Sequence, residues 1–213
     1  MDDMAYKSSE KTRAKKDAKR TAMMQAAVQV FAQKGYHAAT VRDVVKAAKV
    51  AIGTFYFYFP DKETLFVYLY EETSDFLLQT IQQAVNQRDT LAQRIQSGIQ
   101  AYINIGLYDP AVVQLLLVGG VGAVPSLHAK RVEFRKKLTA IWQQVLDQAA
   151  GSGEIEAGET RVSAEMLAGG IDEVILNLLD LPTPELKAPD TIITMTANAL
   201  KLVGYWQTTE KSA

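Results

Sequence analysis

Residues 40–62 bring together side chains that donate hydrogen bonds. The segment carries two threonine and two tyrosine hydroxyls, three lysines and one arginine. Hydroxyl and ammonium groups are suitable donors to phosphate oxygens. An arginine can in addition bond both acceptors on the major-groove edge of guanine. The segment therefore offers binding chemistry directed at a polyanion, provided that its secondary structure places these donors on one surface.

The charge of the chain is divided unevenly along its length. Residues 1–62 contain 12 Lys and Arg against 6 Asp and Glu, whereas residues 63–213 contain 11 against 18. The formal net charge of −1 conceals this division. A basic N-terminal part on an acidic remainder favours a polyanionic partner. The alternative, solvated charge without a partner, accounts for the extreme tail but less well for a whole polarised third of the chain.

The sequence gives no support for enzyme activity. The glycine-rich segment GGVGAVP, residues 119–125, places Pro125 where a dinucleotide-binding loop needs glycine, and no predicted strand precedes it. The chain contains no Walker lysine, no G-x-S-x-G and no H-E-x-x-H. With two histidines, His37 and His128, and no cysteine, a His or thiolate metal centre is implausible. We expect no enzyme activity, no catalytic residues, no cofactor and no metal.

The same composition bears on the compartment. No cysteine is present, which fits a reducing cytoplasm. The N-terminal residues are charged and lack the apolar run of a signal peptide. No stretch approaches the roughly 18 uninterrupted apolar residues of a membrane span. We therefore expect a cytoplasmic protein without a membrane partner.

The pattern of the basic N-terminal part predicts a series of short helices. Apolar residues recur at i, i+3, i+4 and i+7 over residues 21–34, and Gly35 supplies a stop. The next helix starts after the potential cap Thr40, and another restarts after Asp61. Between them lies TFYFYF, residues 54–59, which resembles a strand but has no partner strand nearby. We predict a short helix with Phe55 and Phe59 inward and an exposed aromatic edge.

Helices joined by a tight turn at residues 49–51 predict a helix-turn-helix. Residues 20–66 resemble the N-terminal domain of TetR-family transcriptional regulators. The matching residues are Ala27 and Phe31, then Gly35 and Tyr36, Thr40 and Val41, and AAKVAIGTFYFYFPDKETL at 47–65. The spacing of Gly53, Thr54, Tyr56, Phe59, Lys62 and Glu63 is the most specific part. The sequence departs from the family pattern at Lys49, commonly glycine, and at Ala51, often serine.

The resemblance implies that the third helix enters the major groove of double-stranded DNA. Ala51 and Ile52 can contact a thymine methyl group. Arg42 is the proposed guanine reader, with a phosphate contact or a plain surface charge as the alternatives. Lysines of the N-terminal tail would add attraction that is blind to sequence, or serve only as solubilising charge. The complete set of expected DNA-binding residues is Thr40, Arg42, Lys49, Ala51, Ile52, Gly53, Thr54, Tyr56, Phe57, Tyr58 and Lys62.

A lysine in the turn has a cost if the turn needs positive φ. Strain of about 1–2 kcal/mol is then expected at Lys49. The missing serine cap at Ala51 costs about 1 kcal/mol. Lys49 can instead gain a contact to the DNA backbone.

The remainder of the chain predicts further helices at about 62–86, 91–106, 110–118, 126–149, 160–180 and 190–207. We therefore expect an all-α protein with a basic flexible arm (1–19), a three-helix helix-turn-helix DNA-binding domain (20–66) and a C-terminal helical effector-binding and dimerisation domain (67–213). The resemblance implies a homodimer in which the last two long helices pair with their copies. The expected interface residues are Leu167, Ile171, Val174, Leu178, Ala199, Val203 and Trp206. The alternative is that both helices are fully occupied by their own core.

The resemblance also implies a small-molecule effector inside the C-terminal domain. Arg131 falls within an apolar helical stripe, with His128 and Arg135 beside it, and a cation there needs a partner. That partner is either an acidic residue such as Asp172 or Glu173, or the anionic group of a lipophilic effector. Tyr102 is a further lining candidate, with plain core packing as its alternative. The expected function is a repressor that binds a palindromic operator as a dimer and is released by the effector; the alternative is a helical adaptor without specific DNA binding.

Overall fold

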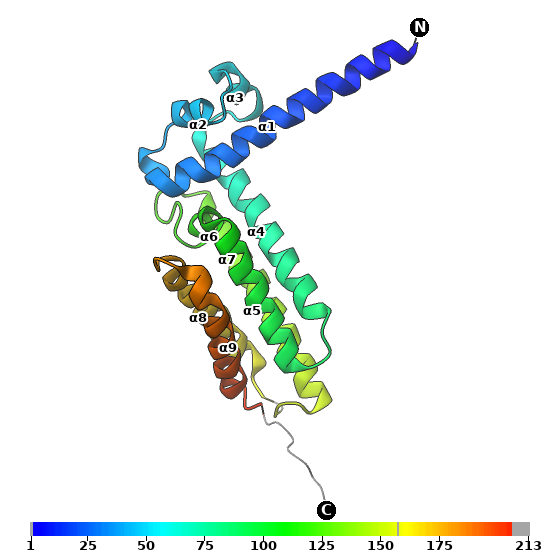
Figure 1. The fold of residues 1–213 in the computed structure, drawn as a ribbon, viewed down its shortest axis with the longest axis vertical. Helices are drawn as coiled ribbons and strands as arrows, with labels where there is room; N and C mark the ends of the chain where they lie inside the picture. The colour runs from blue at the N-terminus through cyan, green and yellow to red at the C-terminus, as the bar shows by residue number, and fades with distance from the viewer. Residues whose placement is uncertain (1, 157, 206–213) are drawn as a thin grey trace, which may run out of the picture. The chain divides into compact units, whose positions relative to one another are not determined.

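The computed structural model describes residues 2–156 and 158–205, and every regular element in these ranges is a helix (Figure 1). The all-α fold predicted from the sequence is confirmed. In chain order the helices are α1 (Asp2–Ala38), α2 (Val41–Ala47), α3 (Ile52–Tyr58), α4 (Lys62–Asn86), α5 (Leu91–Tyr108), α6 (Pro110–Leu117), α7 (Leu127–Ser152), α8 (Thr160–Leu179) and α9 (Pro184–Leu202). None of these described helices is long and apolar enough to cross a membrane.

The chain divides into two compact units. The first consists of Met1–Glu72 and Gln114–Lys130, and the second of Thr73–Val113 and Arg131–Ala213. Helices α4, α6 and α7 contribute residues to both units. The sequence placed a boundary at residue 66 and assigned all later residues to the body. The structure groups residues 114–130 with the first unit because their contacts lie there.

The first unit is built around an aromatic core. Phe55 and Phe66 are fully buried, and Phe31 is 4% exposed. The rings of Phe31 and Phe66 meet edge to face with centroids 4.8 Å apart, a favourable arrangement of aromatic quadrupoles. TFYFYF is helical, as predicted, and Phe55 with Phe59 packs inward. The core therefore fixes which side of α3 remains at the surface.

Helix α1 is much longer than the expected 21–34. It begins at Asp2, so residues 1–19, expected to be a flexible arm, are helical from Asp2 onward. Five Lys and three Ala lie there and no Gly or Pro interrupts them, which favours helix. The predicted stop is present: the backbone at Gly35 has φ 72° and ψ 165°, outside the helical region. Figure 1 shows the N-terminal part of α1 extending beyond α2 and α3.

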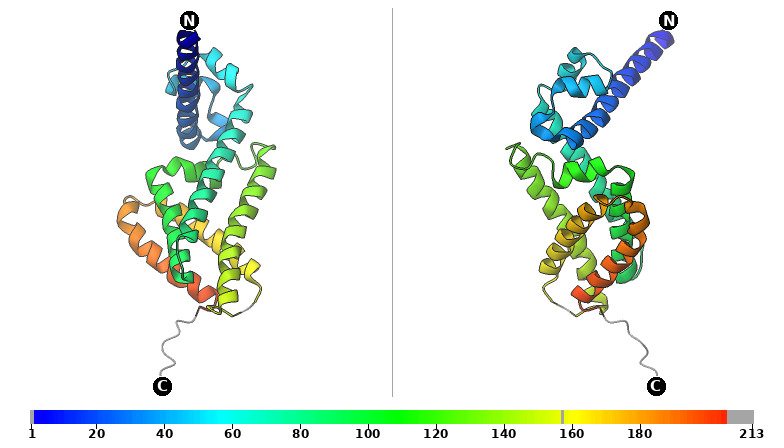
Figure 2. Two further views of the ribbon diagram at one scale, coloured as in Figure 1. Left: turned by 90° about the vertical axis from the view of Figure 1, so that its right-hand side faces the viewer. Right: turned by 60° about the vertical axis from the view of Figure 1, so that its left-hand side comes forward.

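The second unit is a bundle in which α5, α8 and α9 contact one another. Figure 2 shows α8 and α9 side by side in two further views. Ile99, Tyr102 and Ile175 are fully buried, and Trp142 is 1% exposed. Gly98 allows close packing here, because a Cβ at this position would lie 2.6 Å from the Trp142 ring. The bundle thus has a dense core of its own.

Helix α9 differs from the expected 190–207 at both ends. It begins at Pro184, whose missing N–H is not needed at a first helical position, and it includes Pro189. Its end at Leu202 is followed by Gly204 with φ 65°. The prolines misled the sequence-based start, since proline usually marks a helix boundary. Trp206, which the sequence assigned to the dimer interface, lies outside the described residues.

Candidate functional site

Helix α3 presents a mixed aromatic and apolar surface to solvent. Tyr56 is 56% exposed, Phe57 67% and Ile52 46%. Tyr58 is half-buried, and its ring meets that of Phe57 edge to face. Gly53 lies on the same side, where a Cβ would meet nothing within 4 Å. Packing within the protein therefore does not require glycine at this position, whereas a closely approaching ligand would.

The turn before α3 contains a residue with positive φ, as the sequence analysis considered for Lys49. Lys49 has φ 54°, and it is the one non-glycine residue with positive φ in the described ranges. The N–H of Val50 bonds the carbonyl of Val45, which closes the end of α2. Ala51 occupies the cap position of α3 without a side-chain hydrogen bond. Both departures from the family pattern therefore fall on positions where backbone geometry matters.

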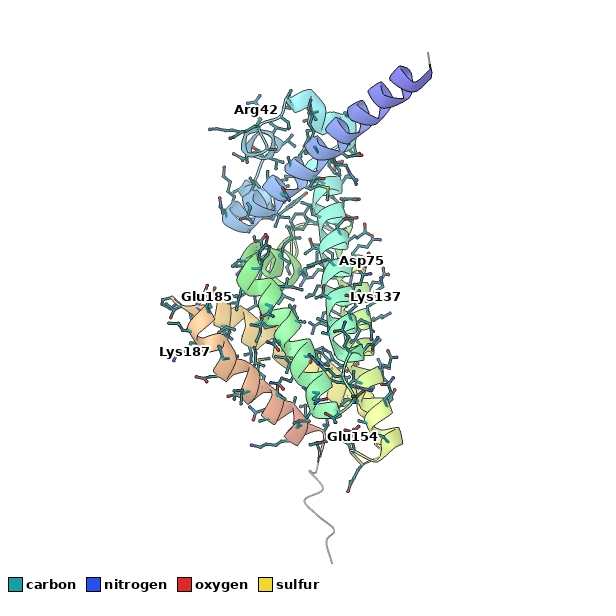
Figure 3. All side chains as sticks on the ribbon, turned by 45° about the vertical axis from the view of Figure 1, so that its right-hand side comes forward. Arg42, Asp75, Lys137, Glu154, Glu185 and Lys187 are labelled. Atoms are coloured by element: carbon teal, nitrogen blue, oxygen red, sulfur yellow. The ribbon has the colours of Figure 1, made fainter. Side chains whose placement is uncertain are left out.

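Helix α2 supplies the cations nearest to the turn. Arg42 is exposed, and Figure 3 shows its side chain projecting from α2. Lys46, also exposed, lies one helical turn after Arg42 and so on the same side of α2. The sequence-based set omitted Lys46, although its spacing from Arg42 was sufficient to include it. Arg42, Lys46 and Lys49 are all exposed, so three positive charges lie on α2 and the turn that follows it.

Thr40 serves as a helix cap. Its hydroxyl accepts from the Asp43 N–H at 3.1 Å and donates to the Asp43 carboxylate at 2.7 Å. The Asp43 carboxylate in turn accepts from the Thr40 N–H and from Lys34. These bonds, that of Lys34 first, lower the pKa of Asp43 to about 2. Because the Thr40 hydroxyl proton is already used, a phosphate contact by its side chain would have to break this cap.

Lys62 holds the end of α1 and the segment after it. Its ammonium donates to the carbonyls of Tyr36 at 2.7 Å and Ala39 at 2.9 Å, and lies 4.3 Å from the Tyr36 ring centroid. The Lys62 Nζ also donates to the carbonyl of His37 at 3.4 Å, so each of its three donors has an acceptor within the protein. The structure therefore gives Lys62 a role in positioning this segment, and its expected phosphate contact would have to replace the long bond to His37.

Two of the four expected effector residues meet in the second unit. The Tyr102 hydroxyl donates to the Asp172 carboxylate at 2.9 Å, and Arg135 pairs with the other oxygen of the same carboxylate. Tyr102 is fully buried and Asp172 is 7% exposed. Asp172 was considered a partner for Arg131, but in the structure it pairs with Arg135. The cluster ties α5, α7 and α8 together.

The other two expected effector residues lie elsewhere. Arg131 is half-buried on α7, one helical turn before Arg135. His128 is exposed and belongs to the first unit, whereas the other three belong to the second. The sequence did not single out Trp142, whose Nε1 is buried and has no hydrogen-bond partner among the described residues. Such a donor is costly to leave unpaired in a protein interior.

Helices α8 and α9 carry two different sets of apolar residues. Leu167, Ile171, Leu178 and Ala199, expected at a dimer interface, are at most 5% exposed and pack in the core of the protomer itself. Val174 is 36% exposed and Val203 is half-buried. The helical spacing led to the face that is buried within the protomer. Spacing alone does not distinguish that face from a second apolar face that is exposed. The exposed apolar residues of these helices are Val162, Met166, Val174, Leu186, Ile193 and Leu202.

Comparison with known proteins agrees with this arrangement. Residues 23–69 match the family described as bacterial regulatory proteins, tetR family. The chain is 28% identical over 163 residues to the fatty acid metabolism regulator protein of Bacillus subtilis, covering 72% of this chain and 79% of that protein. It is 24% identical to the transcriptional activator FasR of Mycolicibacterium smegmatis, covering 70% and 67%.

Solved structures share the fold. The regulator FadR of Bacillus subtilis, solved in complex with stearoyl-CoA, superposes with a TM-score of 0.72 at 23% identity, covering 84% of this chain and 98% of that one. The short α2, the turn and the exposed α3 define a helix-turn-helix DNA-binding protein. Residues 23–69 of the chain form a DNA-binding domain of the tetR family of bacterial regulatory proteins, and the chain is similar over most of its length to a transcriptional regulator.

Proposed function

We propose that this protein binds a palindromic operator as a homodimer and that a long-chain fatty acyl-CoA releases it. The observation that carries this proposal is the extent of the likeness to the Bacillus subtilis fatty acid metabolism regulator. The alignment covers 163 residues, whereas the matched DNA-binding domain covers only residues 23–69. The likeness therefore includes much of the helical part in which an effector would bind.

The exposed surface of α2 and α3 supports DNA recognition. Arg42 would read guanine, and Ile52 would contact a thymine methyl group. The hydroxyls of Thr54, Tyr56 and Tyr58, together with Lys49, would bond phosphates. Open space around Gly53 supports a close approach of α3 to the major groove. The lysines and arginines at the start of α1 would add attraction independent of sequence.

A homodimer would be formed by the exposed apolar side chains of α8 and α9. Val162, Met166 and Val174 recur along α8, and Leu186 and Ile193 along α9. A Cβ at Gly170 would meet nothing within 4 Å, which leaves room for a close partner helix. Two heads separated by about 34–36 Å, one turn of DNA, would read the two halves of a palindrome.

Release by the effector would follow from unequal affinity for two states of the dimer. A ligand that binds better when the heads are misspaced weakens DNA binding by that difference in affinity. Helix α4 contributes to both units, so it is the proposed route between effector and head. The Tyr102–Asp172–Arg135 cluster links three helices of the second unit and would have to adjust to a ligand entering among them.

Selection of binding sites from random duplex DNA tests the DNA-binding part of the proposal. We expect an inverted repeat that is bound at least a thousandfold more tightly than a scrambled duplex, within the range of specific regulators. Two protomers per site are expected in sedimentation. Equal and steeply salt-dependent binding to both duplexes would show that the basic residues act without sequence recognition, and would contradict the proposal.

A further inference from the structure

The ammonium of Lys62, the first residue of α4, gathers three backbone carbonyl groups. Its Nζ lies 2.7 Å from the carbonyl oxygen of Tyr36, 2.9 Å from that of Ala39 and 3.4 Å from that of His37. It also lies 4.3 Å from the centroid of the Tyr36 ring, within the range of a cation–π contact. An ammonium has three N–H donors, so all the donors of this half-buried side chain are used inside the first unit.

These carbonyls need a donor because of where they lie in the chain. Tyr36 and His37 belong to the last turn of α1, and the last four carbonyls of an α-helix have no N–H partner within it. A cation at this end also interacts favourably with the helix dipole. Lys62 therefore closes the end of α1 from α4, although Tyr36 and Lys62 are 26 residues apart in sequence.

The same ammonium holds the backbone at the entrance to α2. Ala39 is 1% exposed, and the next residue is Thr40, the cap of α2. The Thr40 N–H donates to the Asp43 carboxylate at 2.9 Å, and the Asp43 N–H donates to the Thr40 hydroxyl at 3.1 Å. The Asp43 carboxylate also accepts from Lys34 of α1 at 2.6 Å. The first turn of α2 is thus fixed from two sides, by Lys62 of α4 and by Lys34 of α1.

Arg42 lies inside this first turn. It stands between the two residues of the capping box, and Figure 3 shows its side chain projecting from α2. Further along α2, Val44 is fully buried and Val45 is 8% exposed. A bidentate contact to guanine needs two N–H groups aligned with two base acceptors, and a recognition side chain of this kind has to be held to within about 0.5 Å. The contacts that fix the start of α2 therefore set the direction from which Arg42 reaches a base.

We propose that Lys62 is a positioning residue for operator recognition. Through the carbonyls of Tyr36 and Ala39 it holds the start of α2 and so aims Arg42, and it makes no contact with DNA itself. The inference rests on the operator binding proposed above, and it replaces the phosphate contact that the resemblance implies for Lys62. Because Lys62 begins α4, a displacement of that helix would reach Arg42 through the same bonds.

Lys62→Met in the full chain tests the proposal, because methionine is of similar length but offers no charge and no donor. Two quantities are measured by fluorescence anisotropy. The first is the ratio of the affinities for the selected operator and for a scrambled duplex at one salt concentration. The second is the slope of log affinity against log salt on the scrambled duplex, which reports phosphate contacts without requiring an aligned Arg42.

Two other lysines serve as comparators. Lys46 is exposed on α2, and Lys136 is exposed on α7 in the second unit. Lys46→Met should reduce the slope by about 1, as loss of one phosphate contact does, and Lys136→Met should change neither quantity. Lys62→Met should leave the slope unchanged and lower the affinity ratio about tenfold, within the range of one bidentate arginine–guanine pair.

A double variant tests whether Lys62 acts through Arg42. The effects of two residues that contribute through one contact are not additive. In an Arg42→Ala background, Lys62→Met should therefore lower the affinity ratio by less than about twofold. A further tenfold loss in that background would show that Lys62 contributes independently of Arg42, and would overturn the proposal.

The remaining outcomes are also decisive. A slope loss equal to that of Lys46→Met would identify Lys62 as a phosphate contact and overturn the proposal, as would an unchanged affinity ratio with an unchanged slope. In both cases the proposed function stands, because the wild-type protein still prefers the operator. A wild-type protein without that preference would instead refute the proposed function, and the proposal for Lys62 with it.

A measurement on the wild-type protein decides the matter if circular dichroism shows that Lys62→Met does not fold. The ammonium resonance of Lys62 in NMR spectra should move little when operator DNA is added, whereas that of Lys46 should shift. A shift at Lys62 equal to that at Lys46 would overturn the proposal.

Discussion

The hydroxyl of Tyr102 donates a 2.9 Å hydrogen bond to Asp172, joining α5 to α8 inside the second unit. The same carboxylate is paired with Arg135 on α7, so one buried acid is satisfied by two donors from two helices. A buried carboxylate that loses a donor retains most of its desolvation penalty. This relationship makes Asp172 a point at which the packing of three helices depends on polar contacts.

The first prediction concerns this cluster. Tyr102→Phe removes one donor to Asp172 and should lower the free energy of unfolding by about 1–2 kcal/mol. Urea titration followed by circular dichroism measures the change. Tyr108→Phe is the matched control, since Tyr108 is 93% exposed and should change stability by less than about 0.5 kcal/mol. Equal stability of the two variants would show that the bond contributes nothing.

The turn between α2 and α3 yields a stabilising substitution. Lys49 has φ 54°, which glycine adopts without steric cost. Lys49→Gly should therefore raise the free energy of unfolding by about 1 kcal/mol. Lys46→Gly, within regular α2, should instead lower it by about 1 kcal/mol. Destabilisation by both substitutions would mean that Lys49 gains more from its side chain than it loses through its backbone.

At Gly53 we expect folding and DNA binding to favour different residues. Alanine is a better helix former and meets no atom within 4 Å here, so Gly53→Ala should stabilise the protein by about 0.5–1 kcal/mol. If α3 lies against DNA at this position, the same methyl group should weaken operator binding at least tenfold. Thermal unfolding and anisotropy titration measure the two effects. Unchanged operator affinity would place Gly53 away from the DNA.

The lowered pKa of Asp43 predicts that the protein loses folding stability at acid pH. Its folded pKa of about 2 lies below the unfolded value of roughly 3.9. The carboxylate therefore contributes stability that is fully present above about pH 4 and is lost as the pH falls towards 2. In Asp43→Asn this part of the pH dependence should be absent. NMR titration of the Asp43 side chain gives the folded pKa directly, and a midpoint near 4 would contradict the capping role.

Arg42 and Lys46 should differ in what they recognise. Arg42→Ala should cost about 1–3 kcal/mol on the selected operator and relax the preference for one guanine. Lys46→Ala should weaken binding to all sequences and reduce the slope of log affinity against log salt by about 1. Repeating the site selection with each variant distinguishes the two roles. A uniform loss with Arg42→Ala would identify Arg42 as a phosphate contact instead.

Local patterns predicted the first unit well. Thr40 and Gly35 act where caps and breakers were expected, and the helical spacing of Phe55 and Phe59 resolved TFYFYF against its strand-like composition. The residues of a dimer interface were harder to predict from the sequence, because α8 and α9 are apolar on more than one side. Leu167 and Ile171 share the helical spacing of an interface but are buried within the protomer. Their burial depends on contacts with residues that are distant in sequence. The same holds for Asp172, which pairs with Arg135 instead of Arg131.

The most direct test of the proposed function is the affinity for the selected operator with and without palmitoyl-CoA. Fluorescence anisotropy at constant salt should show at least tenfold weaker binding in saturating palmitoyl-CoA, and no change with CoA alone. The second condition excludes simple competition by phosphates for the DNA-binding surface. Operator affinity that is unchanged or increased by palmitoyl-CoA would contradict release by an acyl-CoA.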